Sequence, residues 1–221
     1  MNVALVIPAY NEEERIENVI RTAQRSDVLS EIVVVSDGST DNTVQVALEC
    51  NVQTVALPIN QGKGAAMQYG VENTDSEIIV FLDADLVNLK VEHIESLVNP
   101  IIEDNMDMTC GVFQAGRDST DMHHKITPWL TGQRAAKREV IESCTDLTES
   151  KYGAELSLTK KAVEEKLKVK KVCLKGLTHT TKEEKIGLVK GFWARLKMYW
   201  QVISYFRKND LKYDSIDAVM E

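Results

Sequence analysis

Two aspartates, Asp83 and Asp85, directly follow an apolar run that ends at Leu82. Positions two apart on a strand face the same side, so a strand ending here presents both carboxylates to one place. Carboxylates held this close shift each other's pKa unless a cation lies beside them. A hard divalent cation such as Mg²⁺ takes a few carboxylate oxygens and completes its shell with water or phosphate. The pair therefore predicts a site for a metal that carries a diphosphate; the alternative is a strand end with two solvated acids.

Three earlier apolar runs also end in turns that carry polar residues or glycine. Residues 3–7 lead into PAYNEEE, residues 32–35 lead into SDGSTDNT, and the run VQTVALP leads into NQGKGAAMQYG. In the third turn Gly62 lets the backbone approach a ligand, and Lys63 places a positive charge near a helix N-terminus. Each of these turns is therefore a candidate to contact the same ligand.

Strands that alternate with helical patterns predict an α/β fold with a mostly parallel sheet flanked by helices. In such sheets, ligands bind outside the carboxyl ends of the strands. The four polar turns are expected to meet at that edge, where a nucleotide would lie.

The segments PAYNEEE, SDGSTDNT, NQGKGAA and DADL, in this order, resemble the nucleotide-sugar-binding half of GT-A glycosyltransferases, especially family 2. The resemblance covers about residues 2–115, roughly half of the chain. It implies a GT-A-like fold and a metal-dependent glycosyltransferase. Such an enzyme moves a sugar from a nucleoside diphosphate sugar, with UDP-sugars favoured, to a small phosphorylated or lipid-linked acceptor.

The resemblance also implies a role for each matching residue. Glu12 would accept hydrogen bonds from ribose hydroxyls, Asp37 would hydrogen-bond the base, and Lys63 would lie along the base or the diphosphate. Asp83 would face the ribose or the metal, and Asp85 would be a direct metal ligand and a catalytic residue. The other residues of the implied nucleotide-sugar site are Pro8, Ala9, Tyr10 and Ala84.

An acceptor site is expected in the second half of the chain, where TPWLTGQRAAKRE predicts a turn and then a helix that begins near Thr131 or Gly132. Gln133 and Arg134 near a helix start suit an anionic or hydroxyl-bearing acceptor. A similar Gly-Gln-Arg segment occurs in relatives that act on lipid or phosphorylated acceptors. We therefore predict acceptor contacts from Gly132, Gln133 and Arg134; the alternative is a surface helix with basic residues.

Glu155 is the candidate catalytic base, in the first turn of a helix predicted over residues 151–166. In an inverting transfer a carboxylate deprotonates the acceptor hydroxyl. The alternative is an acid that the helix dipole favours at this position, and a phosphate acceptor would need no base.

His179 is the candidate second metal ligand. It follows a strand predicted over residues 167–176 and is expected in a polar loop. This segment resembles the late histidine loop of GT-A enzymes, including glucosyl-3-phosphoglycerate synthase-like proteins, where the histidine completes the metal shell. Imidazole can bind Mn²⁺ alongside carboxylate and phosphate, so the expected cofactor is Mg²⁺ or Mn²⁺. The alternative is a loop histidine without a partner.

The net charge of the 221-residue chain is −8, but it is unevenly distributed. Residues 1–150 carry 10 Lys/Arg and 25 Asp/Glu, whereas residues 151–221 carry 16 and 9. The basic segment 151–221 suits contact with a diphosphate, a phosphorylated acceptor or a membrane surface. The alternative interpretation is that its lysines lie on solvated helix faces. An acidic chain without a recognition-helix pattern argues against nucleic acid as a partner.

The expected organisation is a single GT-A-like domain over residues 1–221. Residues 1–115 would bind the nucleotide sugar, 116–185 would hold the acceptor and complete the metal site, and 186–221 would form an amphipathic C-terminal helix. Aromatic and basic residues over 188–208 predict membrane contact, with core packing or homodimer pairing as alternatives.

Cellular location is predicted from cysteine usage and hydropathy. Four scattered cysteines suit a reducing compartment, and we find neither a signal peptide nor an apolar run of membrane-spanning length. The expected location is cytoplasmic, with the inner face of the membrane as the site of any membrane contact.

Two other functions are compatible with a nucleotide-binding sheet. A sugar-phosphate nucleotidylyltransferase would need a glycine-rich turn after the first strand, and PAYNEEE has no glycine there. A non-catalytic nucleotide-sugar-binding protein would need Asp37 and Glu12 but no metal site. Turnover separates the enzyme from the binding protein, and pyrophosphate release identifies the nucleotidylyltransferase.

Overall fold

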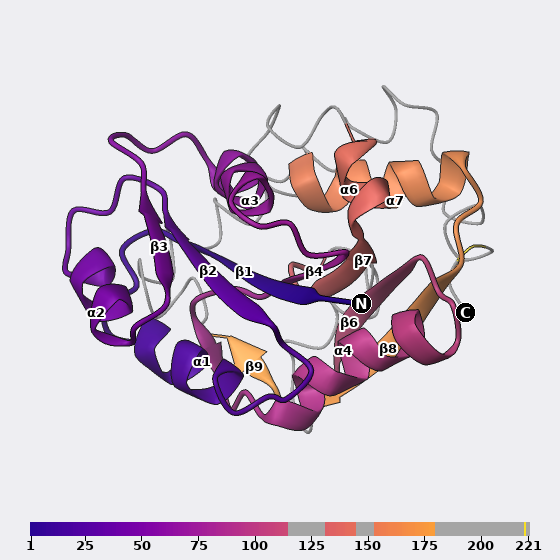
Figure 1. Ribbon diagram of the computed structural model, residues 1–221, viewed down its shortest axis with the longest axis horizontal. Coiled ribbons are helices and arrows are strands. Elements are labelled where there is room, and N and C mark those ends of the chain that lie inside the picture. Colours follow the sequence, from indigo (N-terminus) through magenta and orange to yellow (C-terminus); the bar gives the residue numbers. More distant parts are fainter. Residues whose placement is uncertain (115–130, 145–152, 180–218, 220–221) are drawn as a thin grey trace, which may run out of the picture.

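The computed structural model describes residues 1–114, 131–144, 153–179 and 219 (Figure 1). The described strands are β1 (Val3–Ala9), β2 (Glu31–Ser36), β3 (Gln53–Ala56), β4 (Ile78–Phe81), β5 (Leu86–Val87), β6 (Met108–Gln114), β7 (Arg134–Lys137), β8 (Val169–Lys175) and β9 (Thr178–His179). The described helices are α1 (Ile16–Ala23), α2 (Thr43–Glu49), α3 (Lys63–Glu72), α4 (Val91–Glu103), α6 (Arg138–Glu142) and α7 (Gly153–Glu164).

A seven-stranded sheet with the order β3-β2-β1-β4-β7-β6-β8 forms the centre of the fold. Among these strands, β7 is antiparallel to both of its neighbours, and all the other pairs are parallel. A small second sheet pairs β5 with β9. The predicted α/β class and mostly parallel sheet are confirmed, whereas the predicted C-terminal helix lies outside the described residues.

Helices cover both faces of the large sheet (Figure 1). Alternate residues of β1 point to opposite faces. Ala4 and Val6 join a buried cluster with residues of α3, α6 and α7. Val3, Leu5 and Ile7 join a second cluster with residues of α1, α2 and α4. Because both faces are covered, β1 and β4 are apolar throughout, and the polar residues Tyr10 and Asp83 come only after these two strands have ended.

No helix in the described part of the chain is both long and apolar enough to span a lipid bilayer.

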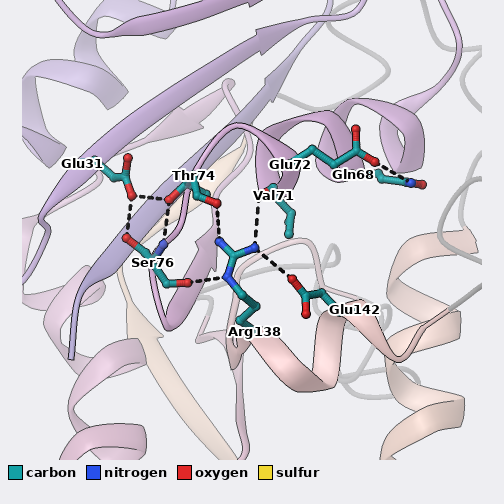
Figure 2. Close-up of polar contacts among 8 residues, drawn as sticks. All are labelled: Glu31, Gln68, Val71, Glu72, Thr74, Ser76, Arg138 and Glu142. Atoms are coloured by element: carbon teal, nitrogen blue, oxygen red, sulfur yellow. Dashed lines mark hydrogen bonds and ion pairs between the residues drawn. The ribbon is translucent and has the colours of Figure 1, made fainter.

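Arg138, the first residue of α6, binds the main chain at the edge of the sheet opposite the polar turns (Figure 2). Its guanidinium donates to the carbonyl oxygens of Ser76 at 2.7 Å, Thr74 at 2.6 Å and Val71 at 3.3 Å. The Glu31 carboxylate accepts from the hydroxyls of Thr74 and Ser76. These bonds tie the end of α3 and the start of β4 to α6.

We expect Arg138→Leu to lower the free energy of unfolding by roughly 2–4 kcal/mol, because it leaves three carbonyl groups without this donor. Urea denaturation of both proteins measures the difference. Glu142→Gln is the matched control, since it removes only the exposed ion pair with Arg138 and should cost less than about 0.5 kcal/mol. A similar loss in both variants would contradict the role given to the carbonyl contacts.

Candidate active site at the carboxyl edge of the sheet

Asp83 and Asp85 lie between β4 and β5, directly past the carboxyl end of β4. Leu82 and Ala84, which alternate with them, are 0% and 3% exposed, whereas both aspartates are partly exposed. The alternation expected for a strand end is therefore present, and both acidic residues can be reached by a ligand at this edge.

Lys63 joins Asp83 to Glu155. Its Nζ atom lies 2.6 Å from Asp83 Oδ1 and 2.6 Å from Glu155 Oε1. Lys63 is the first residue of α3, and Glu155 lies in the first turn of α7 as predicted. We call Lys63, Asp83 and Glu155 the carboxylate–lysine cluster. The sequence assigned these residues to three separate roles, and the structure brings their side chains into contact.

The electrostatics of this cluster keep Lys63 charged. Burial alone would lower the pKa of Lys63, but the adjacent carboxylates of Asp83 and Glu155 outweigh it and hold that pKa above its usual value. At neutral pH two carboxylates and one ammonium leave one net negative charge, and Asp85 adds a second. This charge suits a divalent cation.

The loop of residues 131–133 lies beside Asp83 because β7 pairs with β4, which places Arg134 opposite Phe81. Gln133 Nε2 donates to Asp83 Oδ2 at 2.8 Å. A Cβ atom added at Gly132 would lie 2.7 Å from Asp83 Oδ1 and closer still to Lys63 Nζ. Gly132 and Gln133 thus border the cluster directly; their predicted contact with an acceptor stays a prediction.

The predicted helix start near Thr131 or Gly132 is wrong. Residues Arg134–Lys137 form β7 instead, and the helix that follows begins at Arg138. This segment forms a strand because it lies between β4 and β6. There its backbone N–H and C=O groups pair with strands on both sides, and Ala135 and Ala136 are buried.

Arg134 is buried, with 1% of the residue exposed. Its guanidinium donates to the Thr131 carbonyl at 3.0 Å and to the Thr159 hydroxyl at 2.9 Å. This burial disfavours the predicted contact between Arg134 and an acceptor, and the structure gives the residue contacts within the protein instead.

Asp37 holds the loop that precedes α3. Its two carboxylate oxygens accept from the backbone N–H groups of Gln61 at 2.7 Å and Gly62 at 2.8 Å, and the residue is 3% exposed. Its own N–H donates to the carbonyl of Ala9 at 2.8 Å. Asp37 therefore joins the ends of β1 and β2 to the start of α3, and its predicted hydrogen bond to a base stays a prediction.

The remaining predicted donor-site residues lie along the same edge. Pro8 and Ala9 end β1 and are buried, and Tyr10, the next residue, is 48% exposed. Glu12 lies in the following turn with a side chain 12% exposed, and its N–H donates to the Thr43 hydroxyl at 2.8 Å. Tyr10 therefore presents an exposed aromatic ring at this edge, and the predicted contacts of Tyr10 and Glu12 with a base and a ribose stay predictions.

His179 lies in β9 rather than in a loop, so that part of its prediction is wrong. The pairing of β9 with β5 places His179 opposite Leu86, the residue after Asp85. The main chain of His179 is therefore brought to the aspartate pair over a long sequence separation. Its role as a metal ligand stays a prediction, because its side chain is outside the described part.

The residues at this edge fit a magnesium or manganese ion in their chemistry. Asp83 and Asp85 supply the carboxylate oxygens that such ions prefer. Among the side chains that the structure describes, no three His, Cys, Asp or Glu residues gather into a complete metal site. An ion with few protein ligands is usual for Mg²⁺, which takes the others from water and substrate phosphate.

We expect Gly132→Ala to disturb the cluster without unfolding the protein, because the three atoms nearest to the added methyl group are the side-chain ends of Lys63 and Asp83. Turnover should fall by roughly 10-fold, in line with a displacement of an ångström or less in a site. The control is the same substitution in a Lys63→Met background, where the loss should be much smaller. An equal loss in both backgrounds would contradict the steric explanation.

Sequence reasoning missed Thr131 and Thr159, which both contact Arg134. It also missed that Gln61 and Gly62 act through their backbone N–H groups. A buried threonine, whether in a loop as Thr131 or in a helix as Thr159, has no distinctive sequence pattern. The sequence features that indicate the contact between Asp37 and the 61–62 backbone are an acid directly after β2 and a glycine directly before α3.

The family profile described as Glycosyl transferase family 2 matches residues 4–153 of this chain. Dolichyl-phosphate beta-glucosyltransferase ALG5A of Trichomonas vaginalis is 38% identical over 97 residues, covering 38% of this chain and 30% of that protein. Glucosyl-3-phosphoglycerate synthase of Mycobacterium tuberculosis is 32% identical over 109 residues, covering 45% and 34%. The matched segments thus span about a third of the length of these relatives.

Solved structures of the mycobacterial synthase share the fold of this chain. Its crystal structure with Mn²⁺ and UDP-glucose has a TM-score of 0.75 and 25% identity, covering 94% of this chain and 78% of the synthase. Its crystal structure with phosphoglyceric acid has a TM-score of 0.69 and 27% identity, covering 81% and 72%.

Proposed function

This chain belongs to glycosyltransferase family 2, and from that membership we propose that it transfers a sugar from a nucleoside diphosphate sugar to an acceptor. The observation that carries this proposal is the meeting of Lys63, Asp83 and Glu155 beside the 131–133 loop at the carboxyl edge of the sheet. Ligands of α/β sheets bind at that edge.

For the donor, we propose a UDP-sugar. A solved relative contains UDP-glucose and Mn²⁺, which supports this donor class and a divalent ion. Asp85, with Asp83 and His179, would hold Mg²⁺ or Mn²⁺, and the bound ion stabilises the charge on a diphosphate leaving group. Tyr10 and Glu12 would contact the base and ribose, with Pro8, Ala9, Asp37 and Ala84 shaping that side of the site.

For the acceptor, we propose a small phosphorylated molecule or a lipid phosphate. The names of two relatives support these two kinds, since one is a dolichyl-phosphate glucosyltransferase and the other a glucosyl-3-phosphoglycerate synthase. Gly132 and Gln133 would border the acceptor. Glu155 would take a proton from an acceptor hydroxyl, and the hydrogen bond from Lys63 fixes the position of its carboxylate.

For the organisation of the chain, we propose one glycosyltransferase domain with donor-binding residues in 1–115 and acceptor-binding residues in 116–185. Residues 186–221, with the predicted amphipathic segment 188–208, lie outside the described residues apart from Val219. Contact of that segment with the inner face of a membrane, or pairing with a second copy of the chain, stays a prediction, as does the cytoplasmic location.

Turnover of defined donors tests the proposed function. The purified chain is incubated with UDP-glucose or GDP-mannose, each with 3-phosphoglycerate or a polyprenyl phosphate, in Mn²⁺, in Mg²⁺ and in EDTA. We expect release of the nucleoside diphosphate with one donor only, dependent on an acceptor and abolished by EDTA.

Two results would overturn the proposal. Release of pyrophosphate from a nucleoside triphosphate and a sugar phosphate would identify a nucleotidylyltransferase. Tight metal-dependent binding of a nucleotide sugar, without turnover on any of these acceptors, would identify a non-catalytic binding protein. Calorimetric titration of UDP and GDP with the same protein separates this second result from simple failure to bind.

A further inference from the structure

A closed ring of polar contacts runs through the carboxylate–lysine cluster. Starting from Lys63, the ring passes through Glu155, Thr159, Arg134, Thr131, Gln133 and Asp83, and then returns to Lys63; we call these seven residues the polar ring. Its closing contacts are the two ion pairs of Lys63 and the bond from Gln133 to Asp83.

Arg134 joins the two halves of the polar ring. On one side its Nε atom donates to the Thr131 carbonyl at 3.0 Å, and the Thr131 hydroxyl donates to Gln133 Oε1 at 2.8 Å. On the other side its Nη2 atom donates to the Thr159 hydroxyl at 2.9 Å, which in turn donates to the Glu155 carbonyl at 2.8 Å. One guanidinium thus links the 131–133 loop to the first turn of α7.

The shape and burial of this guanidinium make it a rigid link. Its N–H groups point in fixed directions within one plane, so two bonds from it set the separation of their acceptors. Arg134, Gln133 and Thr159 are each 1% exposed. In such a buried setting hydrogen bonds strengthen one another, and loss of one partner is costly.

We propose that Arg134 is a positioning residue for sugar transfer. Through Thr131 and Thr159 it sets the distance between the loop that binds Asp83 and the helix that carries Glu155, and so keeps Lys63 between the two carboxylates. This inference rests on the proposed function, because it concerns the placement of Asp83 and Glu155 for that reaction. It assigns Arg134 a role that needs no contact with the acceptor.

Thr159→Val is the test variant, because loss of a buried arginine risks unfolding the protein. Valine has nearly the shape of threonine, but it can neither accept the hydrogen bond from Arg134 nor donate one to the backbone carbonyl of Glu155. Thr159→Ser keeps the hydroxyl and is the matched control. The kcat and the KM for UDP-glucose are measured with Mn²⁺ and 3-phosphoglycerate, or with a polyprenyl phosphate, in the wild-type and Glu155→Gln backgrounds.

We expect Thr159→Val to lower kcat about 10-fold and to change the KM for UDP-glucose less than about twofold. In the Glu155→Gln background the same substitution should lower kcat less than about twofold, because residues that act through one another are not additive. Thr159→Ser should stay near the wild-type value. If Glu155→Gln shows no measurable turnover, hydrogen exchange at the backbone amides of residues 131–133 replaces kcat as the readout in both backgrounds.

A purely structural role for Arg134 predicts a different result. In that case Thr159→Val would lower the fraction of active protein, and therefore kcat, by the same factor in the wild-type and Glu155→Gln backgrounds. That outcome overturns the proposal. An unchanged kcat in Thr159→Val overturns it as well. Arg134→Lys, which keeps the charge but not the planar fork, should behave like Thr159→Val if it folds.

Hydrogen exchange distinguishes failure of this inference from failure of the proposed function. If the wild-type protein turns over no nucleotide sugar, the proposed function fails. The link through Arg134 is then tested by the hydrogen-exchange rates of the backbone amides of residues 131–133. Faster exchange there in Thr159→Val, but not in Thr159→Ser, supports the link through Arg134. Exchange that is unchanged in both variants overturns it.

Discussion

Replacement of Asp85 by asparagine is expected to lower the turnover of a nucleotide sugar about 1000-fold. Asp85 lies past the end of β4, two residues after Asp83, where its carboxylate adds a negative charge to this edge of the sheet. Asparagine keeps the size of the side chain but loses this charge, so a divalent ion is held less tightly. Calorimetry should show UDP binding in Mn²⁺ weakened about 100-fold, and binding in EDTA nearly unchanged.

Asp75→Asn is the matched control for this prediction. It removes the same charge from an exposed position in the turn before β4. Turnover and UDP binding should both stay within about twofold of the wild-type values, as for surface substitutions away from a site. Equal binding of UDP by wild-type and Asp85→Asn proteins in Mn²⁺ would exclude Asp85 as a ligand of the ion.

Replacement of Lys63 by methionine is expected to lower both stability and turnover. It leaves the carboxylates of Asp83 and Glu155, which both lie 2.6 Å from the same ammonium, facing each other without a cation. The free energy of unfolding should fall by roughly 2–4 kcal/mol, less than for a fully buried pair because Lys63 and Asp83 are about 30% exposed. Turnover should fall at least about 100-fold.

A second substitution separates these two effects. Lys63→Met combined with Glu155→Gln removes the repulsion, so it should regain at least about 1 kcal/mol of stability without regaining turnover. Lys137→Met is the control for loss of a lysine ion pair elsewhere, since Lys137 contacts Asp107 at 2.8 Å with similar exposure. Its turnover should remain normal. Full turnover in Lys63→Met would remove the cluster from the proposed mechanism.

Much of the donor half could be predicted from local sequence. Apolar runs at residues 3–7, 32–35 and 78–81 form the strands, and each run stops where polar residues begin. Parallel strands end at one edge of a sheet, so a list of strand ends is also a list of residues that meet there. That rule predicts Asp37, Lys63 and Asp83 at one edge; in the structure Lys63 contacts Asp83, and Asp37 holds the loop that precedes Lys63.

The acceptor half could not be predicted in this way. The segment after Gln133 has an alanine-rich, charged sequence that favours a helix, yet it forms β7. The gap between β4 and β6 offers hydrogen bonds on both sides, and these outweigh a local preference worth well under about 1 kcal/mol per residue. The position of β7 between these strands also buries Arg134. The sequence predicts that Arg134 contacts an acceptor, whereas in the structure it joins Thr131 to Thr159.

The sequence by itself determined the family, the α/β class and the residue types that a nucleotide, a metal and an acceptor would need. Those properties depend on short motifs and on hydrophobic runs, which are local. Only the tertiary structure decided which of these residues act together. Lys63 and Glu155 are 92 positions apart, and Asp83 and Gln133 are 50 apart. The pairing of β7 with β4 and the packing of α7 beside α3 bring them within hydrogen-bonding distance, and no local pattern carries that information.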